Sequence, residues 1–231
     1  MWHAQRSVRA CAGSAWATLV PLSLGIWIGL VPSAATAQVG PFRVGPIVGA
    51  TAATVYGDEV VDEEWRKSFL VGGAMSWHPE GSRLGLESGA IYLSKGVNFG
   101  GGRDDGQAGL KLSYVEIPLL LRIRLSSDGG GVVPVLLLGS SLGINVGCQL
   151  EGSSEDVSFE IDCDAPELED ALDVNSLDAG LSGGAALEFT VSGRALSLSA
   201  RYTRGLTDVA DSAVSAPIRN SAVQVSLAYW L

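Results

Sequence analysis

Several residue types are scarce in this 231-residue sequence, and each scarcity removes a class of function. Lys and Arg together number 15, against 25 Asp and Glu, so the formal net charge is −10. A protein that binds nucleic acid through its phosphates needs a basic patch, and nothing in the sequence supplies one. We therefore expect no nucleic-acid partner. The acidity fits solubility or a salty habitat, with cation capture by acidic loops as the alternative.

Long apolar runs are also scarce: one occurs at residues 15–31, and none of that length follows it. Basic residues precede this run, and residues 35–37 (Ala-Thr-Ala) form an A-x-A cleavage site, as in a secretory signal peptide. We predict that residues 1–37 are a cleaved signal peptide and that residues 38–231 form one domain. The mature chain then contains no segment that could form a membrane helix.

Cysteine is rare, with three residues in the chain. Cys11 lies inside the predicted signal peptide, which leaves Cys148 and Cys163 in the mature protein. An even pair in an exported chain predicts a disulfide, with two free thiols as the alternative. The bridge would close a loop of about 15 residues and contribute up to about 3 kcal/mol in the chain-entropy description.

A strict period of two runs along residues 113–125. Every second residue from Val115 to Leu125 is apolar, whereas the alternate row, from Tyr114 to Arg124, carries three charges. Successive side chains of a β-strand point to opposite faces, so this pattern predicts a strand with one apolar and one polar face. A transmembrane strand needs roughly 9–11 tilted residues to cross the hydrocarbon. The stretch is therefore typical of a wall between lipid and a polar interior.

Seven other segments show weaker alternation and are separated by turn residues. The predicted strands are 42–55, 66–78, 83–95, 110–125, 132–147, 177–191, 194–204 and 221–231. Long connections at 56–65, 96–109, 148–176 and 205–220 alternate with short ones. Outer-membrane barrels carry short turns at one end and long loops at the other. We predict an all-β fold: an eight-stranded antiparallel up-and-down transmembrane β-barrel, with one or two helical turns within residues 165–172.

Six charged residues fall on the rows opposite the apolar ones. Glu87, Arg122 and Glu188 each lie a few residues from a predicted short turn, which places them at similar depth. A charge that is removed from water needs a partner. We therefore predict an ion-pair network that fills the lumen, made by Glu87, Glu116, Arg122, Arg124, Glu188 and Arg201.

Two segments carry a family resemblance. Residues 114–121 read Tyr-Val-Glu-Ile-Pro-Leu-Leu-Leu, and residues 85–96 end in Lys-Gly. The first resembles the signature strand of the PorT-like outer-membrane β-barrel family of Bacteroidetes-type bacteria, and the second resembles that family's preceding strand with its Lys-Gly exit. The resemblance implies an eight-stranded barrel in the bacterial outer membrane. Some members of that family serve a protein secretion system, so the resemblance also implies an accessory role in secretion as one option.

The last predicted strand is similar to the C-terminal signal that the barrel assembly machinery reads. Its apolar residues recur at alternate positions from Val223 to the end of the chain, although Leu231 stands where Phe is usual. We therefore expect the barrel assembly machinery to be one partner of this strand.

We expect no enzymatic activity, no cofactor and no metal site. Barrel lipases, lipid A deacylases and outer-membrane proteases use a histidine as base, and His78, the single histidine after residue 37, lies in a predicted turn. The glycine runs at 100–102 and 129–131 do not belong to a GxxxxGK[ST] phosphate loop. The acidic segments 104–105 and 151–173 lack the D-x-D-x-D-G spacing of calcium loops. Calcium binding by these segments is the open alternative.

The strand number bears directly on function. An eight-stranded barrel has an interior that side chains just fill, while general porins have about 16 strands. We therefore predict a scaffold or interaction module that contacts outer-membrane lipid and offers its long outer loops to a protein partner. The alternatives are a narrow solute channel and a soluble lipocalin-like carrier of small apolar ligands, whose apolar rows would face inward.

Gel migration and extraction behaviour separate the membrane barrel from the soluble carrier. We expect the folded protein to migrate differently before and after heating, and to leave the membrane fraction only with detergent. Both results follow from a closed barrel with an apolar exterior. Release of the protein into buffer without detergent would support the carrier instead.

Overall fold

The computed structural model describes residues 41–57, 63–100, 107–126, 131–154, 157–163, 174–209 and 218–231. The predicted signal peptide, residues 1–37, lies outside these ranges and stays a prediction. The helical turns expected within residues 165–172 also lie outside them. No helix that could cross a membrane occurs in the described ranges.

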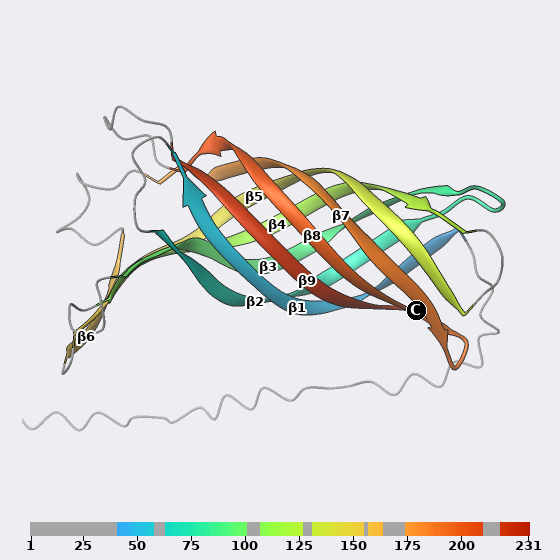
Figure 1. The fold of residues 1–231 in the computed structure, drawn as a ribbon, viewed down its shortest axis with the longest axis horizontal. Helices are drawn as coiled ribbons and strands as arrows, with labels where there is room; N and C mark the ends of the chain where they lie inside the picture. The colour runs from blue at the N-terminus through green and yellow to red at the C-terminus, as the bar shows by residue number, and fades with distance from the viewer. Residues whose placement is uncertain are drawn as a thin grey trace, which may run out of the picture. The chain divides into compact units, whose positions relative to one another are not determined.

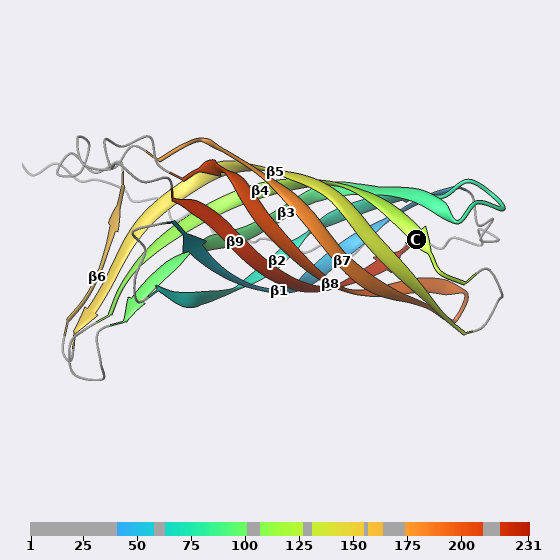
Figure 2. The ribbon, with the colours of Figure 1, turned by 45° about the horizontal axis from the view of Figure 1, so that its top comes forward.

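The described residues form nine β-strands, and eight of them close a barrel (Figures 1 and 2). Around the barrel the order is β4-β3-β2-β1-β9-β8-β7-β5, and pairing of β4 with β5 completes the circle. Every neighbouring pair is antiparallel, so the predicted eight-stranded antiparallel fold is confirmed. The strands are β1 (Phe42–Tyr56), β2 (Glu63–Trp77), β3 (Leu84–Gly100), β4 (Gln107–Arg124), β5 (Val132–Ser154), β6 (Val157–Asp162), β7 (Leu177–Val191), β8 (Arg194–Asp208) and β9 (Arg219–Trp230).

Two of the predicted long loops are partly wrong. Strand β3 runs to Gly100 and β4 begins at Gln107, so most of segment 96–109 is paired. Strand β5 has 23 residues and forms a hairpin with the short strand β6, which occupies part of segment 148–176. Glycine and acidic residues are typical of loops, but a neighbouring strand that satisfies the backbone outweighs that preference here.

Gly96 shows how this extension is accommodated. Its φ is +120°, a conformation that L side chains rarely adopt. The ideal Cβ position at Gly96 also lies against the backbone of Leu110 on the neighbouring strand. A glycine at this position therefore lets β3 continue past Lys95 and remain paired with β4.

The barrel carries its apolar rows on the outside and its charges on the inside. On β4, Leu119 is 57% exposed, whereas Glu116 and Arg122 on the alternate row are 0% and 2% exposed. The same orientation holds on the other seven barrel strands, where large apolar side chains such as Phe69 and Leu181 are exposed. A soluble lipocalin-like carrier needs the opposite orientation, so that alternative is wrong.

Exposed aromatic side chains lie near both ends of the apolar band. Phe42, Trp77 and Tyr229 lie near the end with the short turns, where the Phe42 and Trp77 ring centroids are 6.3 Å apart. Tyr92 and Tyr202 lie toward the end with the long loops. Aromatic girdles at both membrane interfaces are a property of transmembrane barrels.

The sequence predicts a polar lumen, and this expectation is partly wrong. Side chains fill the lumen, but some of them are apolar. An apolar cluster that includes Leu70, Ile91, Leu93 and Leu112 is fully buried beside the charged residues. Some positions on the inward rows are therefore apolar, because an eight-stranded barrel is narrow enough for side chains from opposite walls to pack against each other.

A charge on the outward face should destabilise the barrel in a depth-dependent way. Leu119 lies midway along the apolar band, so Leu119→Arg should cost about 2–4 kcal/mol in the free energy of unfolding from a bilayer. Leu125→Arg, at the end of the band, should cost at most about 1 kcal/mol. Urea titrations of the two variants in liposomes measure both values. Equal costs would contradict a bilayer whose midplane lies near Leu119 and whose interface lies near Leu125.

Candidate functional site

The charged residues inside the barrel lie in two groups at different depths. The six residues predicted from the sequence all point into the lumen, because each occupies the inward row of its strand. The structure divides them between a lower cluster, near the short turns, and an upper cluster, toward the long loops. The two clusters contain different partners and are described separately.

The lower cluster joins strands β3, β4 and β7 through four charged side chains. Arg122 donates one hydrogen bond to Glu87 and another to Glu188. Arg124 Nη2 donates to Glu188 Oε2 at 3.0 Å. The guanidinium of Arg122 also lies 5.7 Å from the centroid of the Trp230 ring, a cation–π contact. The four ion-paired side chains are two acids and two bases, and Arg43 on the inward row of β1 lies close enough to interact electrostatically with Glu188.

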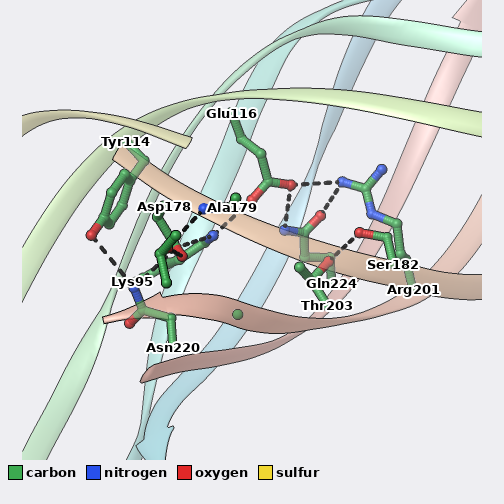
Figure 3. Close-up of polar contacts among 12 residues, drawn as sticks. Lys95, Tyr114, Glu116, Asp178, Ala179, Ser182, Arg201, Thr203, Asn220 and Gln224 are labelled. Atoms are coloured by element: carbon green, nitrogen blue, oxygen red, sulfur yellow. Dashed lines mark hydrogen bonds and ion pairs between the residues drawn. The ribbon is translucent and has the colours of Figure 1, made fainter. Parts of the chain in front are cut away.

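The upper cluster is centred on Glu116 (Figure 3), which is completely buried. Its carboxylate lies 2.9 Å from Lys95 Nζ and accepts a hydrogen bond from Arg201 Nη2 at 3.2 Å. Gln224 Nε2 donates to the same carboxylate at 3.2 Å. Lys95 Nζ also lies 3.0 Å from Asp178 Oδ2, so this cluster too contains two acids and two bases.

Asp178 extends the upper cluster toward the long-loop end of the barrel. Asn220 Nδ2 donates to Asp178 Oδ2 at 3.0 Å, and Thr207 Oγ1 donates to Asp178 Oδ1 at 3.4 Å. The Tyr114 ring lies 5.2 Å from Lys95 Nζ, and its hydroxyl accepts a hydrogen bond from Asn220. Residues from five strands, β3, β4, β7, β8 and β9, therefore meet in one network.

Sequence reasoning missed six members of this network: the charged residues Lys95 and Asp178, and the polar residues Tyr114, Thr207, Asn220 and Gln224. The signal was available for the two charged residues, because both lie on inward rows: Lys95 shares its row with Glu87, and Asp178 shares its row with Glu188. The sequence predicts that a strand ends at Lys95 and that a long loop follows it. The strand continues instead, and the ammonium group points into the barrel.

The acids of both clusters are ion-paired with bases, and this pairing limits which solutes the lumen could pass or bind. A buried ion pair gains little net stability, but an unpaired buried charge is costly. The charged side chains of each cluster form ion pairs with other members of the same cluster. The arrangement closes the lumen and holds strands together, and it leaves none of these four-residue sets with a spare charge.

His78 lies in the turn between β2 and β3. Its Nε2 donates to the Ser82 carbonyl oxygen at 2.8 Å, which fixes the ring across the turn. Burial lowers the pKa of His78, and the positive charge of Arg124 lowers it further. A ring that is hydrogen-bonded across the turn matches the turn role predicted from the sequence.

The long-loop end carries a second group of interactions around the β5–β6 hairpin. A disulfide joins Cys148 and Cys163, whose Cα atoms are 5.4 Å apart. Glu151 on the hairpin accepts from Arg66 Nη2 at 2.7 Å and lies 3.5 Å from Lys111 Nζ. A pocket of about 630 Å³ lies here, lined by residues of β2, β3, β4, β5 and β6.

The described residues contain no group of three or more His, Cys, Asp or Glu side chains placed to hold a metal ion. Residues 104–105 and most of the acidic segment 151–173 lie outside the described ranges or lack described side chains. Calcium binding by those segments therefore stays an open alternative, and the expectation of no metal site stays a prediction.

Comparison with known families agrees with this architecture. Residues 34–211 match the family described as outer membrane protein beta-barrel domain, which is more than half of the chain. The chain belongs to this family. An outer-membrane barrel is also what the apolar exterior and charged interior require, and the protein is therefore an integral barrel of the bacterial outer membrane.

Solved structures of outer-membrane barrels are similar at low identity. Ail of Yersinia pestis is 14% identical, with 82% of this chain and 99% of that chain covered and a TM-score of 0.39. Neisserial surface protein A (NspA) is 12% identical, with 82% and 97% covered and a TM-score of 0.42. The N-terminal barrel of Pseudomonas aeruginosa OprF is 11% identical, with 80% and 97% covered and a TM-score of 0.33. No curated protein matches the sequence.

The finer expectations drawn from the sequence are not tested by these comparisons. Membership of the PorT-like family stays a prediction, and so does recognition of β9 by the barrel assembly machinery. The absence of enzymatic activity likewise stays a prediction for this outer-membrane barrel.

The lower cluster predicts an asymmetry between its two arginines. Arg122→Met would leave Glu87 without its arginine partner in the lumen and should cost about 3–5 kcal/mol in the free energy of unfolding. Arg124→Met should cost much less, because its side chain is 23% exposed and Glu188 keeps Arg122. Urea unfolding in detergent or liposomes measures both costs.

A double variant provides the control. Glu87→Gln removes the charge that Arg122→Met leaves unpaired, so the double variant should be more stable than Arg122→Met alone. Equal losses for Arg122→Met and Arg124→Met would contradict the assignment of Arg122 as the centre of the cluster.

Proposed function

We propose that this outer-membrane barrel is a non-conducting scaffold that presents the β5–β6 hairpin as a recognition element outside the cell. The main observation in support of this proposal is that the hairpin extends from the long-loop end of the barrel, where both views show β6 (Figures 1 and 2). The other long loops of that end would add to the same binding surface, and the barrel itself would contact outer-membrane lipid.

The length of β5 supports this role. A transmembrane strand needs roughly 9–11 residues, whereas β5 has 23. Its first part pairs with β7 inside the barrel wall, up to Ile144, and its last part, from Gln149 to Ser154, pairs with β6. About half of this strand is therefore available to stand beyond the bilayer.

The hairpin is also braced. The Cys148–Cys163 disulfide lies at its base, and Arg66 on β2 forms an ion pair with Glu151 on β5. A binding element that is already ordered loses less conformational entropy when a partner binds. These contacts lie above the part of β5 that pairs with β7, and Cys148 also packs against the apolar cluster of the lumen, which anchors the base of the hairpin.

The filled lumen supports a scaffold over a channel. Lys95, Glu116 and Arg122 are almost fully buried and paired, and they lie in two layers across the lumen. Passage of a solute would require both layers to open and leave buried charges unpaired. We therefore place the function at the outer surface.

Two further roles accompany this proposal. The outward row of β9, from Val223 to Leu231, is proposed as the segment that the barrel assembly machinery reads. The resemblance to the PorT-like family suggests one role for the recognition element, as an accessory part of a protein secretion system. Loss of protein secretion in a strain whose barrel lacks the hairpin would support this secretion role.

Site-specific photo-crosslinking in living cells tests the proposal. A photoreactive amino acid in place of Ser158, which is exposed on β6, should form adducts with a discrete set of proteins. The same amino acid in place of Glu80, which is exposed in the β2–β3 turn, should not form those adducts. Equal adduct patterns at both positions, or no protein adduct at position 158, would contradict the recognition role.

A further inference from the structure

Strand β6 is an edge strand. It ends the order β4-β3-β2-β1-β9-β8-β7-β5-β6, and among the described residues it pairs only with β5. An exposed strand edge presents unpaired backbone N–H and C=O groups, which form a template for another strand. Along the closed wall of the barrel, by contrast, each of the eight strands is paired on both sides.

The register of the hairpin identifies the residues whose backbone groups face this edge. Cys163 N donates to the Cys148 carbonyl oxygen at 3.1 Å, so the backbone N–H of Cys163 points toward β5. Hydrogen-bonded and non-hydrogen-bonded pairs alternate along an antiparallel ladder. With the observed register, Phe159 and Ile161 bond to β5, and Ser158, Glu160 and Asp162 direct their N–H and C=O groups away from it.

The side chains of β6 separate into two rows of different chemistry. Phe159 and Ile161 lie on one face and are 53% and 39% exposed. Glu160 and Asp162 lie on the other face and are also exposed. Glu160 is 3.8 Å from Lys111 Nζ, a long contact at a carboxylate that is 55% exposed, so its charge remains available to a partner.

The sequence around the hairpin adds to this negative charge. Residues 148–176 contain ten Asp and Glu and no Lys or Arg. A second copy of this strand would place acids opposite acids, which is destabilising between paired strands. A cationic strand would place opposite charges on that face, and it would pack apolar side chains against Phe159 and Ile161.

We infer that β6 binds an extended cationic segment of a partner protein by antiparallel strand addition, with alternating basic and apolar side chains in that segment. This inference rests on the proposed recognition role of the hairpin and names the class of partner. The backbone groups of Ser158, Glu160 and Asp162 supply the hydrogen bonds, and the two side-chain rows supply the selectivity.

Binding of a synthetic peptide to the purified full-length barrel in detergent tests this inference. The probe is a fluorescein-labelled hexapeptide of alternating lysine and valine, and its binding is measured by the rise in fluorescence anisotropy. We expect saturable binding that weakens as salt is raised. A hexapeptide of alternating glutamate and valine should not bind.

N-methylation of the peptide separates strand addition from simple charge attraction. In the antiparallel arrangement, the lysine N–H groups face β6 and the valine N–H groups face away. A peptide N-methylated at its lysines should bind roughly tenfold more weakly or worse, because it loses several backbone hydrogen bonds. A peptide N-methylated at its valines should bind like the parent. Equal effects of the two modifications, or no effect of either, would overturn the inference.

Two variants of the protein provide the matching test. Glu160→Pro removes the N–H that faces the free edge, and proline is tolerated at such an edge position because no bond to β5 is lost. It should reduce peptide binding roughly tenfold or more. Glu160→Gln keeps the N–H and should reduce binding less, with a weaker salt dependence. Heat-modifiable migration of both variants checks that the barrel is folded.

The two proposals fail in different ways. Protein adducts at position 158 without peptide binding would overturn strand addition and leave the recognition role standing. Peptide binding without protein adducts at position 158 would overturn the recognition role. A crosslinked dimer of this chain through β6 would identify a second copy as the occupant and overturn the cationic partner.

Discussion

The structure depends on one constraint: inside a bilayer, every backbone N–H and C=O group must find a partner within the protein. Pairing of β4 with β5, from Gln107 with Ser153 to Arg124 with Val135, closes the sheet and removes the two edges that an open eight-stranded sheet would have. Once the sheet is closed, the period of two in each strand places one row toward lipid and one toward the lumen. The apolar exterior and charged interior follow from this closure.

The narrowness of the closed barrel explains how the interior charges are arranged. Side chains from opposite walls reach each other, so Glu116 on β4 accepts a hydrogen bond from Gln224 on β9, four strands away around the barrel. A charge removed from water needs a counter-charge nearby, and in both clusters each buried acid lies within ion-pair distance of a base. Stability and closure of the lumen therefore have the same physical origin, which leaves the surface beyond the bilayer as the place for recognition.

The constraint is relaxed at the long-loop end, and the chain uses different means there. Water can satisfy an exposed backbone, so the edge of β6 is tolerated where an edge within the bilayer would not be. Order is maintained by a disulfide and by the ion pairs of Glu151 with Arg66 and Lys111. This contrast explains why the same chain contains a closed barrel without edges and a hairpin with one.

Alternation of apolar and polar residues determined the strand number, the inward row and the six charged positions, since each is a local property of a strand with a period of two. The sequence alone did not determine that Glu116 would pair with Lys95 and Arg201, because these residues lie on three strands whose register only the closed barrel sets. It also did not determine the β5–β6 hairpin. Its glycine and acidic residues are typical of a loop, and only the neighbouring strand β4 and the Cys148–Cys163 bridge make an extended, paired backbone the more stable conformation.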